Sequence, residues 1–430
     1  MFRPISPTPT VDKFPNDPIF NQLAKLSRNV TGVIVHDRYV LREQLPLEWF
    51  DSKAVFRPEA KPIAILALSG YYYLVSFLTL LALGGKCVPL PCEGRLEDTA
   101  YYLYKSGATH ILIEPNTSKR ATDIKDHVVM SGYLLREIEV QHVKSGSEKY
   151  SEIEINEDLV FPESRPAMVI FTSGTTGKPK GVVHSRLRFY FDGELDPKTH
   201  HLSYRPVHWM ASALIPLRRV LQGGKITFLR SGCADPVILW DVLKEGFVTS
   251  LAIPPSLSKL MHDYYLTTIR HLPVEYHDRY LCLGAPVRGA VIKLSEGDTG
   301  ELLVKTPGMF THYLDDEEAT RAAFDENGFF KTGDIFRRVG SQYYFEGRKS
   351  HDWVQFTAFK ISTMELEYRL LALPYVSEAC VLSILDYEAG ELPAAVIRIK
   401  DGVECEITLR KSCESWQQEK SYLVPFQERR

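Results

Sequence analysis

The stretch AMVIFTSGTTGKPKGVV, Ala167–Val183, decides the fold of this 430-residue chain. Its apolar start, Met168–Phe171, predicts a buried β-strand. The strand runs into residues 172–180, here called the phosphate loop, which are rich in glycine, serine and threonine. Glycines let backbone N–H groups converge on an anion, and hydroxyl groups add further donors. Because Lys178 and Lys180 add positive charge, the sequence predicts a loop that binds a polyphosphate.

The phosphate loop does not match the Walker motif of other nucleotide-binding proteins. That motif needs a glycine five positions before Gly177, where Thr172 stands, and a serine or threonine after Lys178, where Pro179 stands. A flexible Gly/Ser/Thr linker is the alternative interpretation. Linkers rarely follow a buried strand and rarely carry the sequence KPKG, so phosphate binding is favoured.

Short apolar strands alternate with helices on both sides of this loop. Pro62–Leu83 carries no charge and has the length of a membrane span, but Ser69-Gly70 and three adjacent tyrosines inside it favour a strand, a turn and a buried helix. Strand–helix alternation predicts an α/β fold with a largely parallel sheet. We expect strands at residues 63–68, 88–90, 110–113, 225–229 and 248–253, and helices at residues 71–83, 96–105, 236–245 and from Ser256.

The end of the chain has a different pattern. Ser362–Glu365 reads STME, a capping box that predicts the start of a helix with an apolar face. Short strands are expected around it, at residues 343–346, 376–384 and 394–399. The sequence therefore predicts a small α+β domain at residues 348–430, after a larger domain at residues 1–347.

Composition narrows the class of function. The 51 Lys and Arg residues against 54 Asp and Glu give a formal charge of −3 without a basic run, so nucleic acid and anionic membranes are not expected partners. Seven scattered cysteines form neither a disulfide framework nor a CxxC metal site. The sequence contains no HExxH metal motif and no GxSxG esterase motif. Neither end shows a targeting signal, so a cytoplasmic location is expected.

With the phosphate loop as its strongest motif, the chain resembles the adenylate-forming (AMP-binding) superfamily of acyl-CoA synthetases, coumarate–CoA ligases, luciferases and peptide-synthetase adenylation domains. TSGTTGKPKG is that family's phosphate-loop motif. The run KLSEGDTGELLVKTPGMF looks more like malonyl-CoA or medium-chain acyl-CoA synthetases than like peptide-synthetase domains. Other matching stretches follow in the family's order: LALGGKCVPLP (Leu81–Pro91), RPVHWMAS around His208, GELLVKTPGMFTHYL (Gly300–Leu314), KTGD (Lys331–Asp334) and GRKSHD (Gly347–Asp352).

The resemblance implies both a fold and a reaction. The fold is α/β, with a large, shortened AMP-binding N-terminal domain of mainly parallel sheets at residues 1–347 and a small, shortened C-terminal α+β domain at residues 348–430. The reaction is ATP-dependent acid–thiol ligation. A carboxylic acid reacts with ATP to give acyl-AMP and pyrophosphate, and the thiol of CoA then displaces AMP. ATP, CoA and Mg²⁺ are therefore the expected co-substrates and cofactor.

The resemblance also implies roles for individual residues. Asp334 would accept hydrogen bonds from both ribose hydroxyls, Arg348 would donate to the same ribose, and His208 would line the acyl pocket. Taken singly, each has a structural interpretation: a turn aspartate, a solvated loop arginine and a core histidine. No catalytic residue and no protein ligand for a metal are assigned. The β- and γ-phosphates, bridged by Mg²⁺, would be held by Thr172, Ser173, Gly174, Thr175, Thr176, Gly177, Lys178 and Lys180.

Three departures from the family pattern concern catalysis. The tyrosine–glycine–x–threonine–glutamate motif that holds adenine and Mg²⁺ has no match between His208 and Gly300, so a block is expected to be missing near Tyr280–Gly284. The C-terminal PxTxxGK lysine, which stabilises charge developing in the transition state, also has no match. Thr357-Ala358 stands where the family has Gly-Gly, and would narrow the thiol tunnel; Ser350 occupies a hinge position.

These departures leave three hypotheses. The chain is an active ATP-dependent acyl-CoA ligase; or it is a catalytically weak or inactive relative that binds a nucleotide or acyl group; or it is a splice or gene-model product that lacks exons. AMP release with a panel of acids separates the first hypothesis from the others. The identity of the carboxylic acid cannot be read from the sequence, because part of the acyl pocket depends on the missing block.

Overall fold

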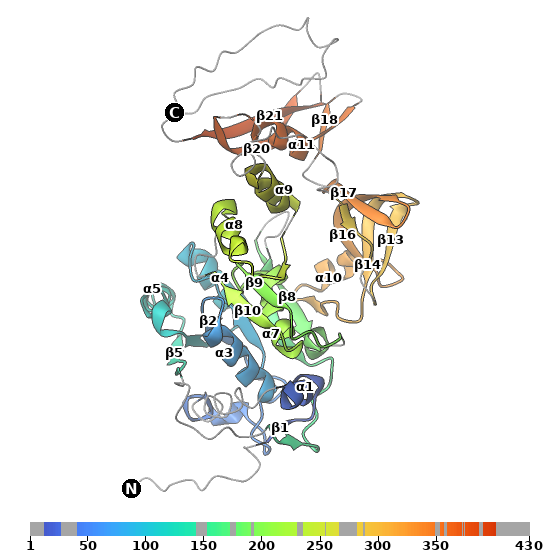
Figure 1. Ribbon diagram of the computed structural model, residues 1–430. Helices are drawn as coiled ribbons and strands as arrows, with labels where there is room; N and C mark the ends of the chain where they lie inside the picture. The colour runs from blue at the N-terminus through green and yellow to red at the C-terminus, as the bar shows by residue number, and fades with distance from the viewer. Residues whose placement is uncertain are drawn as a thin grey trace, which may run out of the picture. The chain divides into compact units, whose positions relative to one another are not determined.

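The computed structural model groups the chain into two compact units, Met1–Tyr276 with Thr306–Ala322, and His277–Lys305 with Ala323–Arg430. Figure 1 draws their helices and strands and labels many of them. The predicted boundary at 347/348 falls inside the second unit and stays a prediction about domain division. The structure describes residues 13–26, 41–142, 153–172, 178–190, 193–229, 235–253, 255–265, 282–286, 289–348, 353–356, 359–371, 373, 375–386 and 390–400.

A seven-stranded sheet forms the centre of the first unit, in the order β15-β8-β7-β3-β2-β4-β5. The strands from β7 to β5 are parallel, as buried apolar strands predict, whereas β8 and β15 join the other edge antiparallel. The strand bounds are β2 (Ile63–Leu66), β3 (Cys87–Pro89), β4 (His110–Ile113), β5 (Arg136–Glu139), β7 (Pro166–Thr172), β8 (Lys180–Ser185) and β15 (His312–Tyr313).

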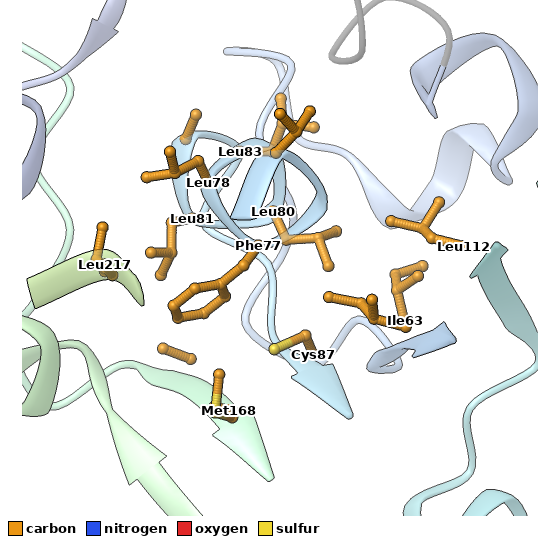
Figure 2. Packing of buried hydrophobic residues seen from close by; sticks show 14 of the residues in the cluster. Ile63, Phe77, Leu78, Leu80, Leu81, Leu83, Cys87, Leu112, Met168 and Leu217 are labelled. Carbon is orange, nitrogen blue, oxygen red and sulfur yellow. The ribbon is translucent and has the colours of Figure 1, made fainter. Parts of the chain in front are cut away.

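The expected buried helix is confirmed as α3 (Tyr71–Ala82). Its side chains Phe77 and Leu80 pack in one cluster with Cys87 of β3 and Met168 of β7 (Figure 2). Each such large apolar side chain stabilises the fold by roughly 1.5–3 kcal/mol on burial. No helix in the described ranges meets the length and hydropathy needed to cross a bilayer. The strand–turn–helix interpretation of this charge-free segment is therefore correct.

The second face of the sheet carries its own apolar cluster, built from α4 (Leu96–Ser106) and α5 (Ser118–Val129). Gly107 ends α4 in the left-handed conformation, with φ of 72°, as expected for a glycine cap. The other elements around this core are β1 (Phe14–Pro15), α1 (Pro18–Leu26), η1 (Leu47–Trp49), η2 (Pro115–Thr117), β6 (Ile155–Asn156), η3 (Arg186–Phe189), α6 (Met210–Ala213) and α7 (Ile215–Leu221).

A second, three-stranded sheet in the first unit is parallel, in the order β10-β9-β11. Its strands are β9 (His200–Ser203), β10 (Lys225–Phe228) and β11 (Ser250–Leu251), and its helices are α8 (Pro236–Lys244) and α9 (Pro255–Tyr264). Asp235 caps α8, because its carboxylate accepts a hydrogen bond from the Val237 N–H at 2.8 Å. The predicted strand and helix order is thus confirmed here, although β11 is shorter than expected.

The second unit contains a five-stranded sheet, β12-β17-β16-β14-β13, that is antiparallel throughout. The sequence predicted only part of β17 and no such sheet. A second sheet, β19-β18-β21-β20, accompanies α11 (Thr363–Leu371), which begins where the capping box predicted. The bounds are β12 (Cys282–Gly284), β13 (Val291–Glu296), β14 (Thr299–Lys305), β16 (Phe330–Val339), β17 (Gln342–Arg348), β18 (Trp353–Phe356), β19 (Phe359–Ser362), β20 (Val376–Asp386) and β21 (Gly390–Ile399). Helix α10 (Glu317–Ala323) belongs to the first unit except for its last residue, Ala323.

Candidate functional site

The phosphate loop lies between β7 and β8. Thr172 ends β7 and pairs in register with Lys180, the first residue of β8. The two ends of the loop are therefore held side by side by an antiparallel strand pair whose middle is buried. The predicted phosphate ligands Ser173, Gly174, Thr175, Thr176 and Gly177 lie outside the described residues, so their roles stay predictions.

The part of the phosphate loop that leads into β8, residues 178–180, carries the two lysines and is here called the lysine limb. The Lys180 ammonium lies 5.1 Å from the centre of the Tyr313 ring and 3.9 Å from the Asp316 carboxylate. Lys178 is exposed on the same limb. Both cations lie at the end of the loop that leads into β8.

Thr172 and His208 line one cavity of about 480 Å³, together with Tyr102, Phe171 and Trp209. A neighbouring cavity of about 290 Å³ shares His208 and Trp209 and is walled by segments that follow β2, β3 and β10. Ligands of parallel α/β sheets bind beyond the carboxyl ends of the strands, which is where both cavities lie. The structure therefore brings together two residues that the sequence predicted for the phosphate and acyl parts of one site.

Burial determines the charge of His208. Removal from water lowers the pKa of its imidazole to about 4. The ring lies edge-on to Trp209, with centroids 6.3 Å apart and an interplanar angle of 89°. His208 is therefore neutral near pH 7, which suits a wall of an apolar acyl pocket; that role stays a prediction.

Asp334 and Arg348 face each other across β16 and β17. They are paired in register, and the Arg348 Nε atom lies 3.0 Å from Asp334 Oδ1. Asp334 lies within a strand, so the turn interpretation is wrong, although Gly333 before it has φ of 74°. The side chains remain 27% exposed for Asp334 and 54% exposed for Arg348. A carboxylate and a guanidinium group that are adjacent and accessible can together bind a diol.

The predicted site residues thus form two groups, one in each compact unit. The first unit holds Thr172, His208 and the loop lysines, and the second holds Asp334 and Arg348. In the described part of the chain, no group of three or more His, Cys, Asp or Glu side chains is arranged to hold a metal ion.

Sequence reasoning missed several residues that surround these groups. Glu93 lines both cavities, and Trp209 is 52% exposed beside His208. Tyr101 of α4 contacts the phosphate loop through a hydrogen bond to the Pro179 carbonyl oxygen. The sequence gives no periodic or motif signal for these contacts, because they join segments far apart in the chain.

Comparisons with known proteins identify the family to which the chain belongs. A family model described as "AMP-binding enzyme" matches residues 56–293, more than half of the chain. The chain is 28% identical over 476 aligned positions to the acyl-CoA ligase oryP of Aspergillus oryzae, with 92% of this chain and 84% of that protein covered. It is 27% identical to the malonate–CoA ligase of Arabidopsis thaliana, with 85% of this chain and 73% of the relative covered.

A solved structure supports the fold. O-succinylbenzoate CoA synthetase (MenE) from Bacillus subtilis, in complex with AMP, superposes with a TM-score of 0.67 at 19% identity, covering 90% of this chain and 89% of that one. The α/β architecture expected from the sequence is therefore confirmed. The alignment with the Aspergillus ligase spans more positions than this chain has residues. Some internal positions of that relative thus have no counterpart here, while the location expected for the missing block, near Tyr280–Gly284, stays a prediction.

Proposed function

The chain belongs to the AMP-binding enzyme family, and from this premise we propose that it is an ATP-dependent acyl-CoA ligase. The observation that carries the proposal is the cavity that Thr172 and His208 line together, since it lies beside the end of the phosphate loop. The acyl-CoA and malonate–CoA ligases among its relatives support the same reaction class. The substrates are a small-molecule carboxylic acid, ATP and CoA.

The first half-reaction depends on positioning and charge more than on covalent catalysis. A carboxylate oxygen of the acid attacks the α-phosphorus of ATP, the bond from that phosphorus to the β-phosphate oxygen breaks, and pyrophosphate leaves. The phosphate loop, with Lys178 and Lys180, holds the β- and γ-phosphates. Asp334 accepts hydrogen bonds from the ribose hydroxyls and Arg348 donates to the ribose. His208, being neutral, lines the acyl pocket without drawing the reacting carboxylate away as an ion pair.

The second half-reaction transfers the acyl group to sulfur. The CoA thiol loses its proton and attacks the acyl carbon, the bond between that carbon and the phosphate oxygen breaks, and AMP leaves. The positions where the family carries its tunnel glycines, Thr357-Ala358, and the hinge residue Ser350 lie outside the described residues. No step is therefore assigned to them.

Mg²⁺ is expected to accompany ATP. When bound, it would neutralise charge on the triphosphate that the phosphate loop holds. A cytoplasmic location rests on the sequence alone and stays a proposal.

The test is a panel of carboxylic acids with ATP, Mg²⁺ and CoA, scored by acid-dependent release of AMP. An acyl-CoA ligase releases AMP and forms a thioester with at least one acid. Stabilisation of the protein by ATP without AMP release for any acid would instead support a nucleotide-binding relative without turnover. That second candidate rests on the adenine-binding motif, which has no match between His208 and Gly300.

A further inference from the structure

Helix α4 places Tyr101 against the lysine limb of the phosphate loop. The Tyr101 hydroxyl donates a hydrogen bond to the carbonyl oxygen of Pro179 at 3.1 Å. Its ring lies 5.6 Å from the ammonium group of Lys178, within the range of a cation–π contact. One side chain therefore holds both the backbone and the cation of this limb.

Tyr101 is presented by a rigid element. Its neighbours on α4, Ala100 and Leu103, are 2% and 0% exposed and pack into the cluster on the second face of the sheet. Gly107 closes the helix in the left-handed conformation. The buried side chains of α4 hold the helix in place. The contacts of Tyr101 therefore restrain the part of the phosphate loop that they reach.

The contact anchors a residue that has few backbone hydrogen bonds available. Pro179 has no N–H, so only its carbonyl oxygen can form a backbone hydrogen bond. The partner of that oxygen is the Tyr101 side chain, 78 residues earlier in the chain. Lys180 is held in a comparable way by the Tyr313 ring. Each loop lysine thus faces one aromatic ring, from a different segment of the first unit.

We propose that Tyr101 is a positioning residue for ATP: it fixes the Lys178–Lys180 limb in the arrangement that receives the triphosphate. This inference rests on the proposed function, because it concerns the same loop. Tyr101 itself does not touch the reacting atoms. It holds residues 178–180 in place before the nucleotide binds, which reduces the free-energy cost of positioning them.

The adjacent tyrosines of α4 provide a contrast. Tyr102 stacks on Phe171, with ring centroids 4.4 Å apart and planes at 15°, and it lines the cavity. Tyr104 packs edge-on against Tyr133 at 4.9 Å and is 40% exposed. Tyr104 is therefore the matched control, since it lies on the same helix and outside the predicted site.

The experiment compares wild type with Tyr101→Phe, Tyr101→Leu and Tyr104→Phe by titration calorimetry with Mg²⁺-ATP, and by the KM values for ATP and for the acid. Tyr101→Phe keeps the ring and removes one hydrogen bond, so the Kd for ATP should rise roughly two- to tenfold. Tyr101→Leu also removes the ring and should raise the Kd further. Neither variant should change the KM for the acid, and Tyr104→Phe should bind ATP like wild type.

The outcomes separate the two proposals. If wild type binds ATP and Tyr101→Phe binds it equally well, the positioning role is contradicted while the proposed function stands. If the KM for the acid rises as much as the KM for ATP, Tyr101 supports the folded structure in general rather than ATP binding, and the inference is contradicted. If wild type binds no ATP, the proposed function itself is contradicted.

Discussion

Two arginine–aspartate pairs, one in each compact unit, have the same chemistry and opposite surroundings. Arg186 and Asp17 in the first unit are 0% and 1% exposed, whereas Arg348 and Asp334 in the second are 54% and 27% exposed. The buried pair also has further hydrogen-bond partners. The Asp17 carboxylate accepts hydrogen bonds from the backbone N–H groups of Ile19 at 3.0 Å and Phe20 at 3.2 Å. Arg186 donates to the Leu81 carbonyl oxygen at 2.9 Å.

The difference in exposure assigns the pairs different tasks. A buried charge that loses its partner is left in a low-dielectric interior, so the Arg186–Asp17 pair must stay closed for α1 to remain docked. An exposed pair is screened by water and loses little when a ligand replaces one of its contacts. The Arg348–Asp334 pair can therefore open toward a ribose without endangering the fold.

The largest expected effect comes from breaking the buried pair. Arg186→Ala leaves the Asp17 carboxylate uncompensated and should lower the free energy of unfolding by roughly 3–5 kcal/mol. Urea denaturation followed by circular dichroism measures the loss. If this variant does not fold, Asp17→Asn, which keeps the cap of α1, should still show a clearly lowered midpoint.

The matched control is an ion pair on the surface. Arg398 and Glu378 lie 3.1 Å apart and are 63% and 70% exposed. Arg398→Ala should leave the urea midpoint close to that of wild type. Equal losses in Arg186→Ala and Arg398→Ala would show that burial does not distinguish these pairs.

The exposed pair should respond in the opposite way. Asp334→Asn removes a charged acceptor and should raise the Kd for Mg²⁺-ATP roughly tenfold to a hundredfold. Its effect on stability should be at most about 1 kcal/mol, since the pair is partly solvated. Calorimetric titration and urea denaturation of the same preparation measure both. A stability loss as large as that of Arg186→Ala, with unchanged ATP affinity, would show that the exposed pair stabilises the fold and does not bind the nucleotide.

Acid should also destabilise the first unit. Burial lowers the pKa of His110, His184, His201 and His208 to about 4, all of them in that unit. An unfolded histidine has a pKa of about 6.5, so between these values the unfolded chain binds protons that the folded chain does not. Stability should therefore be full above about pH 6.5 and fall as the pH is lowered toward 4.

A single variant tests the origin of this acid sensitivity. His184 is 4% exposed, so His184→Gln should reduce the difference between the urea midpoints at pH 7 and pH 5. The exposed His312 provides the control, because His312→Gln should leave that difference as in wild type. An unchanged difference in His184→Gln would show that other groups control the response to acid.

Local patterns in the sequence predicted much of the first unit. The charge-free run Pro62–Leu83 predicted β2 and α3, and the helices expected at residues 96–105 and 236–245 correspond to α4 and α8. These features depend on residues close together in the chain. The antiparallel edge formed by β8 and β15 was not predicted, because His312 and Tyr313 pair with Val183 and Val182 from far along the chain.

The site residues also fall into those that the sequence could predict and those that depend on contacts between distant segments. Motif order identified Thr172, His208, Asp334 and Arg348, and the structure places the first two on one cavity and the last two face to face. It could not identify Tyr101, whose contact with Pro179 depends on the packing of α4 against the sheet. The exposure that separates the two arginine–aspartate pairs is likewise a property of packing, which single-residue identity does not contain.

The central claim is that this chain activates a carboxylic acid with ATP through Asp334 and the phosphate loop. Acid-dependent exchange of labelled pyrophosphate into ATP measures this step alone, without CoA. Wild type should catalyse exchange with at least one acid of a panel, and Asp334→Asn should reduce it strongly at sub-saturating ATP. Wild type that binds ATP but exchanges no pyrophosphate with any acid, or exchange that is unaffected in Asp334→Asn, would contradict the account.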